Sequence, residues 1–192
     1  MKKNLIKFSF LIATFFCTQQ TFAQVSYGVG ANVLNLGIGF GNTITYGVGV
    51  SSSPVISGSF EHGVSKLGPG TLGIGGIISY QATSYNISDV VGTWKEKWTT
   101  TYIALRGTWH PDILVADKYD VYGALDLGYT NYGYSVSGTG GYYERGGSSG
   151  LNNGLGFGLV VGGRYYLSKH IALFGELGYD ICALKIGASV KF

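Results

Sequence analysis

The sequence lacks an apolar run long enough to cross a membrane as a helix, which takes roughly 20 residues. Its clearest apolar run, Phe8 to Cys17, is too short. Cysteine is scarce, and Cys182 is the only one outside that run, so a chain that has lost its N-terminal segment cannot form an intramolecular disulfide. Three lysines among the first seven residues account for the whole excess of 13 Lys and Arg over 10 Asp and Glu. The rest of the chain therefore has no basic footprint for nucleic acid.

Residues 1–23 have the pattern of a cleavable secretory signal peptide. Three lysines precede the short apolar run, and small or polar residues follow it up to Ala23. A lipoprotein signal is the alternative, because Cys17 follows an apolar stretch, but residues 14–16 do not resemble a lipobox. Removal of the signal leaves residues 24–192, which is enough for one domain. If that domain spans a membrane, strands have to do so.

The last ten residues, 183–192, alternate without a break between apolar and polar side chains. One face of such a strand carries Leu184, Ile186, Ala188, Val190 and Phe192, and the other carries Lys185, Gly187, Ser189 and Lys191. If every strand repeats this pattern at membrane length, the apolar face can turn toward lipid instead of a core. A terminal aromatic such as Phe192 also resembles the end of bacterial outer-membrane proteins, where it serves as an assembly signal.

The same alternation recurs along the chain and predicts eight strands. They are residues 33–41, 55–64, 71–81, 99–110, 119–132, 154–167, 170–180 and 183–192. The first, third and fifth connections (42–54, 82–98 and 133–153) are long, the second, fourth and sixth are short, and the seventh breaks this order by being brief. Strand length and loop asymmetry are typical of outer-membrane barrels. We therefore expect an all-β fold, an eight-stranded antiparallel up-and-down transmembrane β-barrel, with long loops extracellular and both termini periplasmic.

The charges test this inside-out arrangement. Those within predicted strands all fall on the polar face: Glu61, Arg106, Asp120, Asp126, Arg164, Glu176, Asp180, Lys185 and Lys191. A charge on the lipid face near the bilayer midplane would cost about 2 to 4 kcal/mol. Outward aromatics near strand ends, expected to form interfacial girdles, are Tyr80, Trp109, Tyr119, Tyr129, Tyr165, Tyr179 and Phe192. His62 also counts outward and is expected at the interface.

The polar face of so small a barrel is a packed interior, because eight strands leave a space that side chains fill. Buried charges need partners. The expected pairs are Arg106 with Asp126, Arg164 with Glu176, and Asp180 with Lys185. The simplest interpretation is that these pairs only hold the barrel together. The alternative is a narrow or gated pore, in which inward glycines leave room for water.

Three stretches resemble the small outer-membrane β-barrel proteins of Bacteroidota, barrels of the OmpA and OmpX type. They are SPVISGSFEHGVSKLGPGTLGIGG (53–76), WHPDILVADKYDVYGALDLGY (109–129) and GGRYYLSKHIALFGELGYDICALKIGASVKF (162–192). The resemblance covers most of the predicted barrel but not the long loops. It implies an integral protein of a Gram-negative outer membrane, whose partners are outer-membrane lipid and, during insertion, the barrel-assembly machinery. It implies little about activity.

No catalytic, cofactor or metal site is evident from the sequence. His62, His110 and His170 are expected near the periplasmic end but apart on the wall, and none has a Ser and a carboxylate at a motif-like spacing. The Gly-x-Gly runs are not followed by a helical pattern, which excludes a dinucleotide loop. We therefore expect a monomeric barrel that is not an enzyme.

Aromatic residues in the long connections are the remaining candidates for contact with a ligand. Trp94 and Trp98 lie in the connection 82–98, and Tyr142 and Tyr143 lie in the connection 133–153. Aromatics among Gly and Ser suit an adaptable binding surface, and they equally suit packing over the barrel mouth. The expected function is a structural or surface-interaction role with an unknown extracellular ligand. A narrow porin-like channel for small solutes is the alternative.

Overall fold

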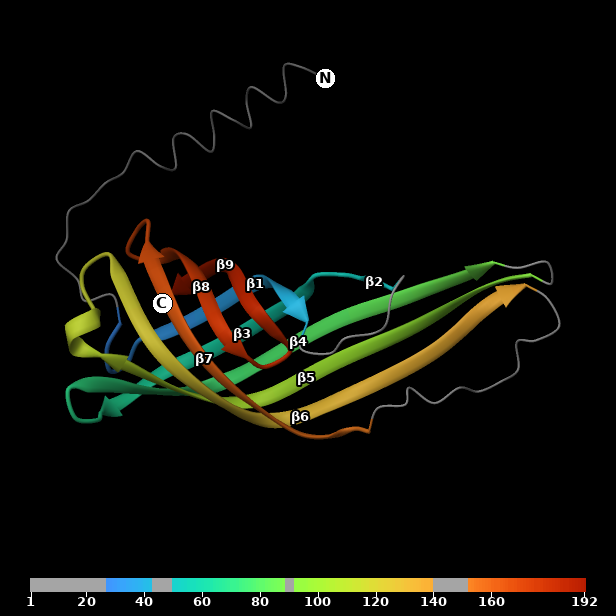
Figure 1. The fold of residues 1–192 in the computed structure, drawn as a ribbon. Helices are drawn as coiled ribbons and strands as arrows, with labels where there is room; N and C mark the ends of the chain where they lie inside the picture. The colour runs from blue at the N-terminus through green and yellow to red at the C-terminus, as the bar shows by residue number, and fades with distance from the viewer. Residues whose placement is uncertain (1–26, 43–49, 89–91, 140–151) are drawn as a thin grey trace, which may run out of the picture.

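The computed structural model describes residues 27–42, 50–88, 92–139 and 152–192, and nearly all of them belong to one closed antiparallel sheet (Figure 1). The expected signal peptide, residues 1–23, lies outside the described residues. Within the described part of the chain, no helix is long and apolar enough to cross a membrane.

The strands run up and down around a barrel. They are β1 (Asn32–Asn42), β3 (Val55–Lys66), β4 (Gly70–Ser88), β5 (Thr93–Pro111), β6 (Tyr119–Thr139), β7 (Gly154–Tyr166), β8 (Ile171–Tyr179) and β9 (Cys182–Lys191). Each of these eight pairs antiparallel with its neighbour in this order, and β1 pairs with β9 to close the ring. The two-residue β2 (Ser51–Ser52) pairs with β4 beyond the start of β3, and a 3-10 helix η1 (Asp112–Leu114) follows β5. The predicted eight-stranded antiparallel barrel is confirmed.

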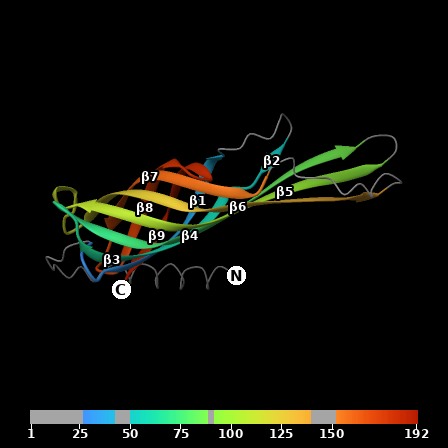
Figure 2. The same ribbon diagram turned by 90° about the horizontal axis from the view of Figure 1, so that it is seen from below.

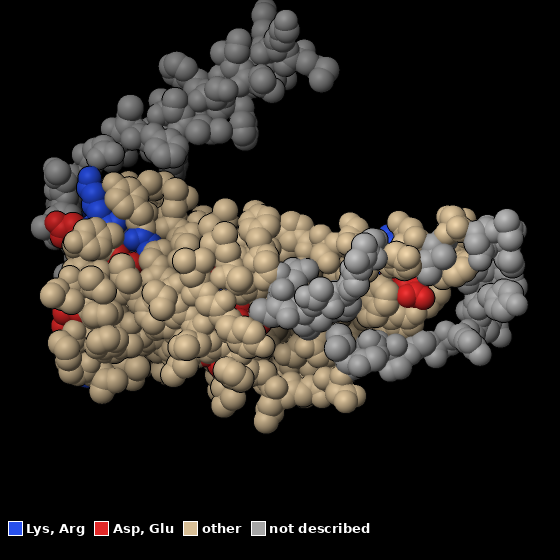
Figure 3. All heavy atoms as spheres, viewed as in Figure 1, with Lys and Arg blue, Asp and Glu red and all other residues tan. Residues whose placement is uncertain are grey.

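The apolar side chains of the wall point outward and the charged ones inward. Leu105 is 77% exposed, while Arg106, the next residue of β5, is 3% exposed. The aromatics Tyr129 and Tyr165 also face outward, as expected of girdle residues. Figure 3 shows a face whose middle is almost free of charged atoms, while Lys, Arg, Asp and Glu lie toward the two ends, most of them at one end. An apolar belt of this size would be an aggregation liability in water, and lipid is the solvent that suits it.

The two ends of the barrel differ in their connections and in how far the strands extend. The near end holds Phe192 and the short connections 67–69, 112–118 and 167–170, of which the first turns at Gly68 with φ +58°. That left-handed conformation favours glycine. The far end holds the other connections, and there three strands continue well beyond the rest (Figure 2).

The extension at the far end is a hairpin with a third strand alongside. Residues 81–88 of β4, 93–101 of β5 and 131–139 of β6 remain paired where β3 and β7 have no further pairing with them. We call these residues the projecting sheet. The expectation of long loops at 82–98 and 133–153 is therefore wrong for most of the first and for the start of the second. The outward residues of these segments are mostly polar, so the alternation of apolar and polar side chains that marks the wall strands is absent from them.

Candidate functional site

The barrel interior is held by ion pairs that reach across several strands. Arg106 donates from Nε and Nη2 to the two carboxylate oxygens of Asp126, both at 2.8 Å, and from Nη1 to Glu176 Oε1 at 2.6 Å. Arg106 and Asp126 are direct cross-strand partners on β5 and β6, whereas Glu176 lies on β8. A planar guanidinium suits this arrangement, because it can satisfy two carboxylates at once.

A lysine continues these contacts toward β9. Lys185 Nζ lies 3.2 Å from Glu176 Oε2 and also donates to Asp180. Glu176 and Lys185 are cross-strand partners, so the short β8–β9 hairpin brings all three together. The structure thus places the two expected pairs Arg106–Asp126 and Asp180–Lys185 in contact, joined through Glu176.

The expected pair of Arg164 and Glu176 is wrong. In the β7–β8 register Arg164 lies opposite Phe174, and Glu176 lies opposite Gly162. Arg164 Nη1 instead lies 2.6 Å from Glu61 Oε1 and 2.9 Å from Asp120 Oδ2, which come from β3 and β6. The space beside Gly162 is filled by the ring of Tyr122, which a side chain at this position would displace.

Tyr122 connects the two groups of charges. Its hydroxyl donates to Glu176 Oε1 at 2.8 Å, and its ring lies 4.4 Å from the Arg164 guanidinium carbon. The charge network therefore spans the lumen as one unit and consists of Glu61, Arg106, His110, Asp120, Asp126, Arg164, Glu176, Asp180 and Lys185.

The near end is closed by a residue that the sequence did not single out. Tyr27 precedes β1, is 2% exposed, and stacks on His110 with ring centroids 3.6 Å apart. Backbone hydrogen bonds from Gly30 to Gly63 and from Gly63 to Ala31 hold this segment against β3. The Gly-rich residues 24–32 have no structure predicted from the sequence, and the single tyrosine among them was the available signal.

Below Tyr27, three residues have the order of a nucleophile, a base and an acid. His110 Nδ1 lies 2.7 Å from Asp120 Oδ1, and His110 Nε2 lies 3.1 Å from Thr108 Oγ1. All three side chains are buried, at 0 to 1% exposure, with Tyr27 over the imidazole. A catalytic triad needs a position for the reacting atom beside the nucleophile, and the packing leaves none here. The other two histidines lie elsewhere: His62 contacts Asn32 Oδ1 at 2.8 Å, and His170 donates to the Lys191 carbonyl at 2.9 Å.

The C-terminal residues named in the sequence lie at the near end. Lys191 faces inward and is partly buried, with Nζ 5.2 Å from the centre of the Tyr166 ring. Phe192 points outward, donates its backbone N–H to the Asn32 carbonyl at 2.9 Å, and lies 6.5 Å from Phe60 between ring centroids. Its role as an assembly signal stays a prediction.

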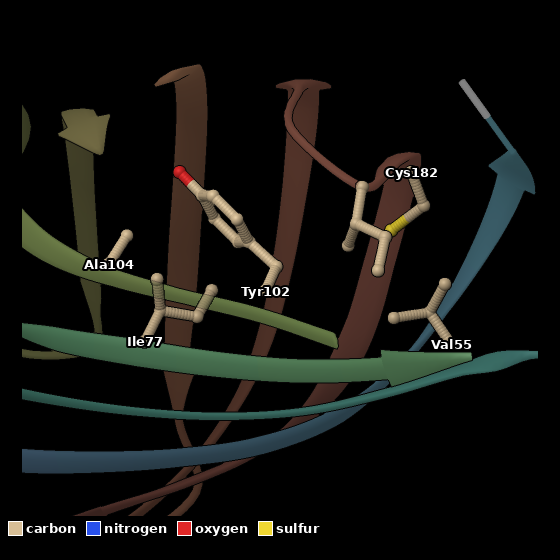
Figure 4. Packing of buried hydrophobic residues seen from close by; sticks show 6 residues of the cluster. Val55, Ile77, Tyr102, Ala104 and Cys182 are labelled. Atoms are coloured by element: carbon tan, nitrogen blue, oxygen red, sulfur yellow. The ribbon is translucent and has the colours of Figure 1, made fainter. Parts of the chain in front are cut away.

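An apolar layer crosses the lumen between the charge network and the far end. It consists of Val55, Ile77, Tyr102, Ala104, Ile181 and Cys182, which come from β3, β4 and β5 on one side and the β8–β9 hairpin on the other (Figure 4). Cys182, the thiol whose role the sequence left open, is buried in this layer.

A pocket opens above the apolar layer at the far-end mouth. Its cavity volume is about 230 Å³. The lining comes from β5, β6, the start of β7 and the β8–β9 turn, and includes Thr100, Tyr102, Thr130, Tyr132 and Asp180. We call it the mouth pocket. On one side it ends at residues 154–158 of β7. These residues lie beyond Leu159, the last residue of β7 that pairs with β8.

The tryptophans predicted for surface contact lie on the projecting sheet. Trp94 and Trp98 share the inward side of β5 with Thr100 and Tyr102, and Trp98 lies 5.4 Å from Tyr134 of β6 between ring centroids. Lys95 and Lys97 alternate with them on the other side. The inner face of the projecting sheet thus carries Trp94, Trp98 and Tyr134 together with Glu96, and it leads into the mouth pocket. Tyr142 and Tyr143 lie outside the described residues.

Similarity to known proteins identifies the family of this chain. A family model described as an outer membrane protein beta-barrel domain matches residues 8–191. The chain belongs to this family. It is an integral protein of the outer membrane, in agreement with the outward apolar belt.

One solved structure shows the same fold at low identity, and a second is similar at a lower TM-score. The outer membrane protein OprG from Pseudomonas aeruginosa is similar at 12% identity with a TM-score of 0.53, over 88% of this chain and 99% of that one. Ail, the attachment invasion locus protein of Yersinia pestis, is similar at 10% identity with a TM-score of 0.48, over 85% and 99%. No curated protein sequence matches the chain.

Proposed function

We propose that this outer-membrane barrel is sealed and displays the projecting sheet outside the cell as a surface for molecular contact. The observation that carries the proposal is the unequal length of the strands. Residues 81–88, 93–101 and 131–139 stay in register well past the ends of β1, β8 and β9. A barrel that served only to span the membrane would not need this extension.

The orientation is part of the proposal. The near end, with Phe192 and the short turns, faces the periplasm, and the far end faces outward, in keeping with the usual asymmetry of bacterial barrels. Lipid and the barrel-assembly machinery are the expected partners, the barrel is a monomer, and the resemblance to proteins of Bacteroidota suggests the source. A tag inserted after Ala116 in the near-end connection should be hidden in intact cells, while a tag within residues 89–91 should be accessible to antibody.

The interior supports a sealed barrel over a narrow pore. The charge network crosses the lumen, Tyr27 packs across its near end, and the apolar layer lies between the network and the far end. Water and ions would have to displace all three. Purified protein in planar bilayers should show no single-channel currents at any applied voltage. Steady unitary currents would contradict the sealed barrel and support the narrow pore.

The interior also supports a role without catalysis. Thr108, His110 and Asp120 satisfy one another inside the packed barrel, so their contacts stabilise the wall and leave no room for a substrate. Replacing Thr108 with Val should lower the stability of the barrel and change no hydrolytic activity of the membrane fraction.

The surface role can be tested by shortening the projecting sheet. Ser84 and Lys97 are cross-strand partners, so residues 85–96 can be replaced by Asn-Gly, which suits a two-residue hairpin. Cells that display the shortened barrel should adhere several-fold less to surfaces coated with mucin, polysaccharide or collagen than cells with the full protein. Equal adhesion on all three surfaces, with equal amounts of folded protein, would overturn the proposal.

A further inference from the structure

The mouth pocket ends blindly inside the barrel. The apolar layer, including the ring of Tyr102, forms its floor. Its volume of about 230 Å³ is below the roughly 300 to 1,000 Å³ of sites for drug-sized ligands. A single ring-sized group fits such a space.

Besides the amide of Asn152 and the carboxylate of Asp180, the polar groups that line the pocket are hydroxyls. Thr100, Tyr102, Thr130 and Tyr132 bring them from two adjacent strands. Tyr102 is only 3% exposed, and its buried hydroxyl has no hydrogen-bond partner among the described residues. Buried hydroxyls in native proteins nearly always have a partner. A bound molecule that presents its own hydroxyl would supply one.

The pocket offers little net charge to a ligand. Asp180 is the one charged residue among its described lining, and its carboxylate already accepts from Lys185 and from the Cys182 backbone N–H. No Lys or Arg lines the cavity, so nothing in it would compensate a sulfate, phosphate or carboxylate. The lining therefore favours an uncharged ligand.

Aromatic rings complete the site. Tyr132 lines the pocket from the inward side of β6, Phe157 lines it from the outward side of β7, and Trp98 and Tyr134 lie above it on the inner face of the projecting sheet. A sugar ring presents hydroxyls at its edge and C–H groups on its faces, so it can give the Tyr102 hydroxyl a partner while a face packs on an aromatic ring. We propose that the mouth pocket binds one uncharged sugar unit of an external glycan, whose chain continues over the aromatic inner face.

Glycine at position 154 keeps the pocket open. A side chain at Gly154 would meet no heavy atom of the described structure within 4 Å, so a larger residue can be placed there without displacing the wall. Because Gly154 lines the cavity, Gly154→Val should occupy the space of the ligand. Gly123 of β6 is a matched control, since it also has open space around it but does not line the pocket.

The second pair of variants removes one hydroxyl each. Tyr102→Phe keeps the ring in the apolar layer and deletes the unpartnered hydroxyl. Tyr166→Phe is its control, because the Tyr166 hydroxyl is also buried without a partner among the described residues but lies away from the pocket.

The test measures binding of methyl glycosides of glucose, galactose, mannose and N-acetylglucosamine to the purified barrel in detergent, by calorimetry and by Trp fluorescence. We expect at least one to bind, Gly154→Val to abolish its binding, and Tyr102→Phe to weaken it about tenfold, the loss of one hydrogen bond. Both control variants should bind as the unchanged protein does. A sulfated disaccharide should not bind.

Three results would overturn the inference: no glycoside binds, binding survives Gly154→Val, or only the sulfated sugar binds. The inference rests on the proposed surface role, since it names a ligand for the same outward end. The two can fail separately, however. Glycoside binding is measured on the purified barrel, and adhesion is measured on cells. If no glycoside binds but the shortened variant loses adhesion, only the sugar site is contradicted.

Discussion

The wall of the barrel and the projecting sheet consist of the same strands and obey opposite rules. In the wall of β5, Leu105 faces out and Arg106 faces in. Further along the same strand, Lys95 and Lys97 lie on the outward side and Trp94 and Trp98 on the inward side. The alternation is unbroken, but the outward face has changed from apolar to polar, while the inward face carries Trp94 and Trp98 together with Glu96.

The change in the outward face marks where the solvent changes. A strand bordered by lipid must hide its charges, whereas a strand bordered by water keeps its charges outward and shelters its aromatics. The outward side of β5 changes from polar to apolar between Thr101 and Ile103, close to the mouth pocket. We therefore infer that the boundary of the membrane passes near this level.

The largest expected effect comes from opening the charge network. Arg106→Ala leaves Asp126 and Glu176 buried without their guanidinium and should cost about 3 to 5 kcal/mol in the free energy of unfolding. Urea unfolding of the barrel in lipid vesicles measures it. Lys66→Ala breaks an exposed pair with Asp112 and should cost no more than about 1 kcal/mol. Equal effects of the two variants would contradict the packed interior.

A charge on the outward face should discriminate wall from projecting sheet. Leu105→Arg places it against lipid and should cost about 2 to 4 kcal/mol. Ser135→Arg places the same charge on the outward side of the projecting sheet and should change stability by less than about 0.5 kcal/mol. The same vesicle unfolding assay applies, and a reversed order would mean that lipid contacts the projecting sheet.

The packing of Tyr122 gives a smaller effect. Gly162→Val pushes a side chain into the Tyr122 ring and should cost about 1 to 3 kcal/mol. Gly123→Val, which has open space around it, should be close to neutral in the same assay. A neutral Gly162→Val would indicate that the interior is looser than the structure shows.

The smallest effect on stability should come from shortening the projecting sheet. Replacement of residues 85–96 by Asn-Gly removes no contact of the charge network or of the apolar layer. Heat-modifiable migration in unboiled gel samples and the urea midpoint should stay as in the full protein, because an extension of this kind unfolds locally. A shortened variant that fails to form the barrel would make the projecting sheet part of the folding unit.

Alternation alone predicted the eight strands and the side of the wall on which each residue lies, because a period of two assigns both. Neighbouring strands also made the Arg106–Asp126 pair predictable. The partners of Arg164 were not. Asp120 lies directly opposite it on the neighbouring β6, but the long connection between β6 and β7 leaves their register open, and Glu61 comes from β3, which does not pair with β7.

The structure at the two ends of the barrel was not predictable from the alternation of apolar and polar residues. The projecting sheet is hard to predict as strand because its outward face is polar, as residues 93–99 show. Tyr27 was missed because a lone aromatic in a Gly-rich stretch carries no periodic signal. The alternation places His110 and Tyr122 on the polar faces of their strands. It does not predict their contacts, because these depend on how the strands curve around the lumen.

The contact of the wall with lipid is the central claim, and quenching by spin-labelled lipid tests it most directly. In a Cys182→Ala background, a fluorophore is attached to a single cysteine at Leu127, on the outward wall, or at Ser135, on the projecting sheet. The account predicts that lipid-borne nitroxide quenches the probe at 127 and that aqueous iodide quenches the probe at 135. Quenching at 127 by iodide and not by the lipid would contradict it.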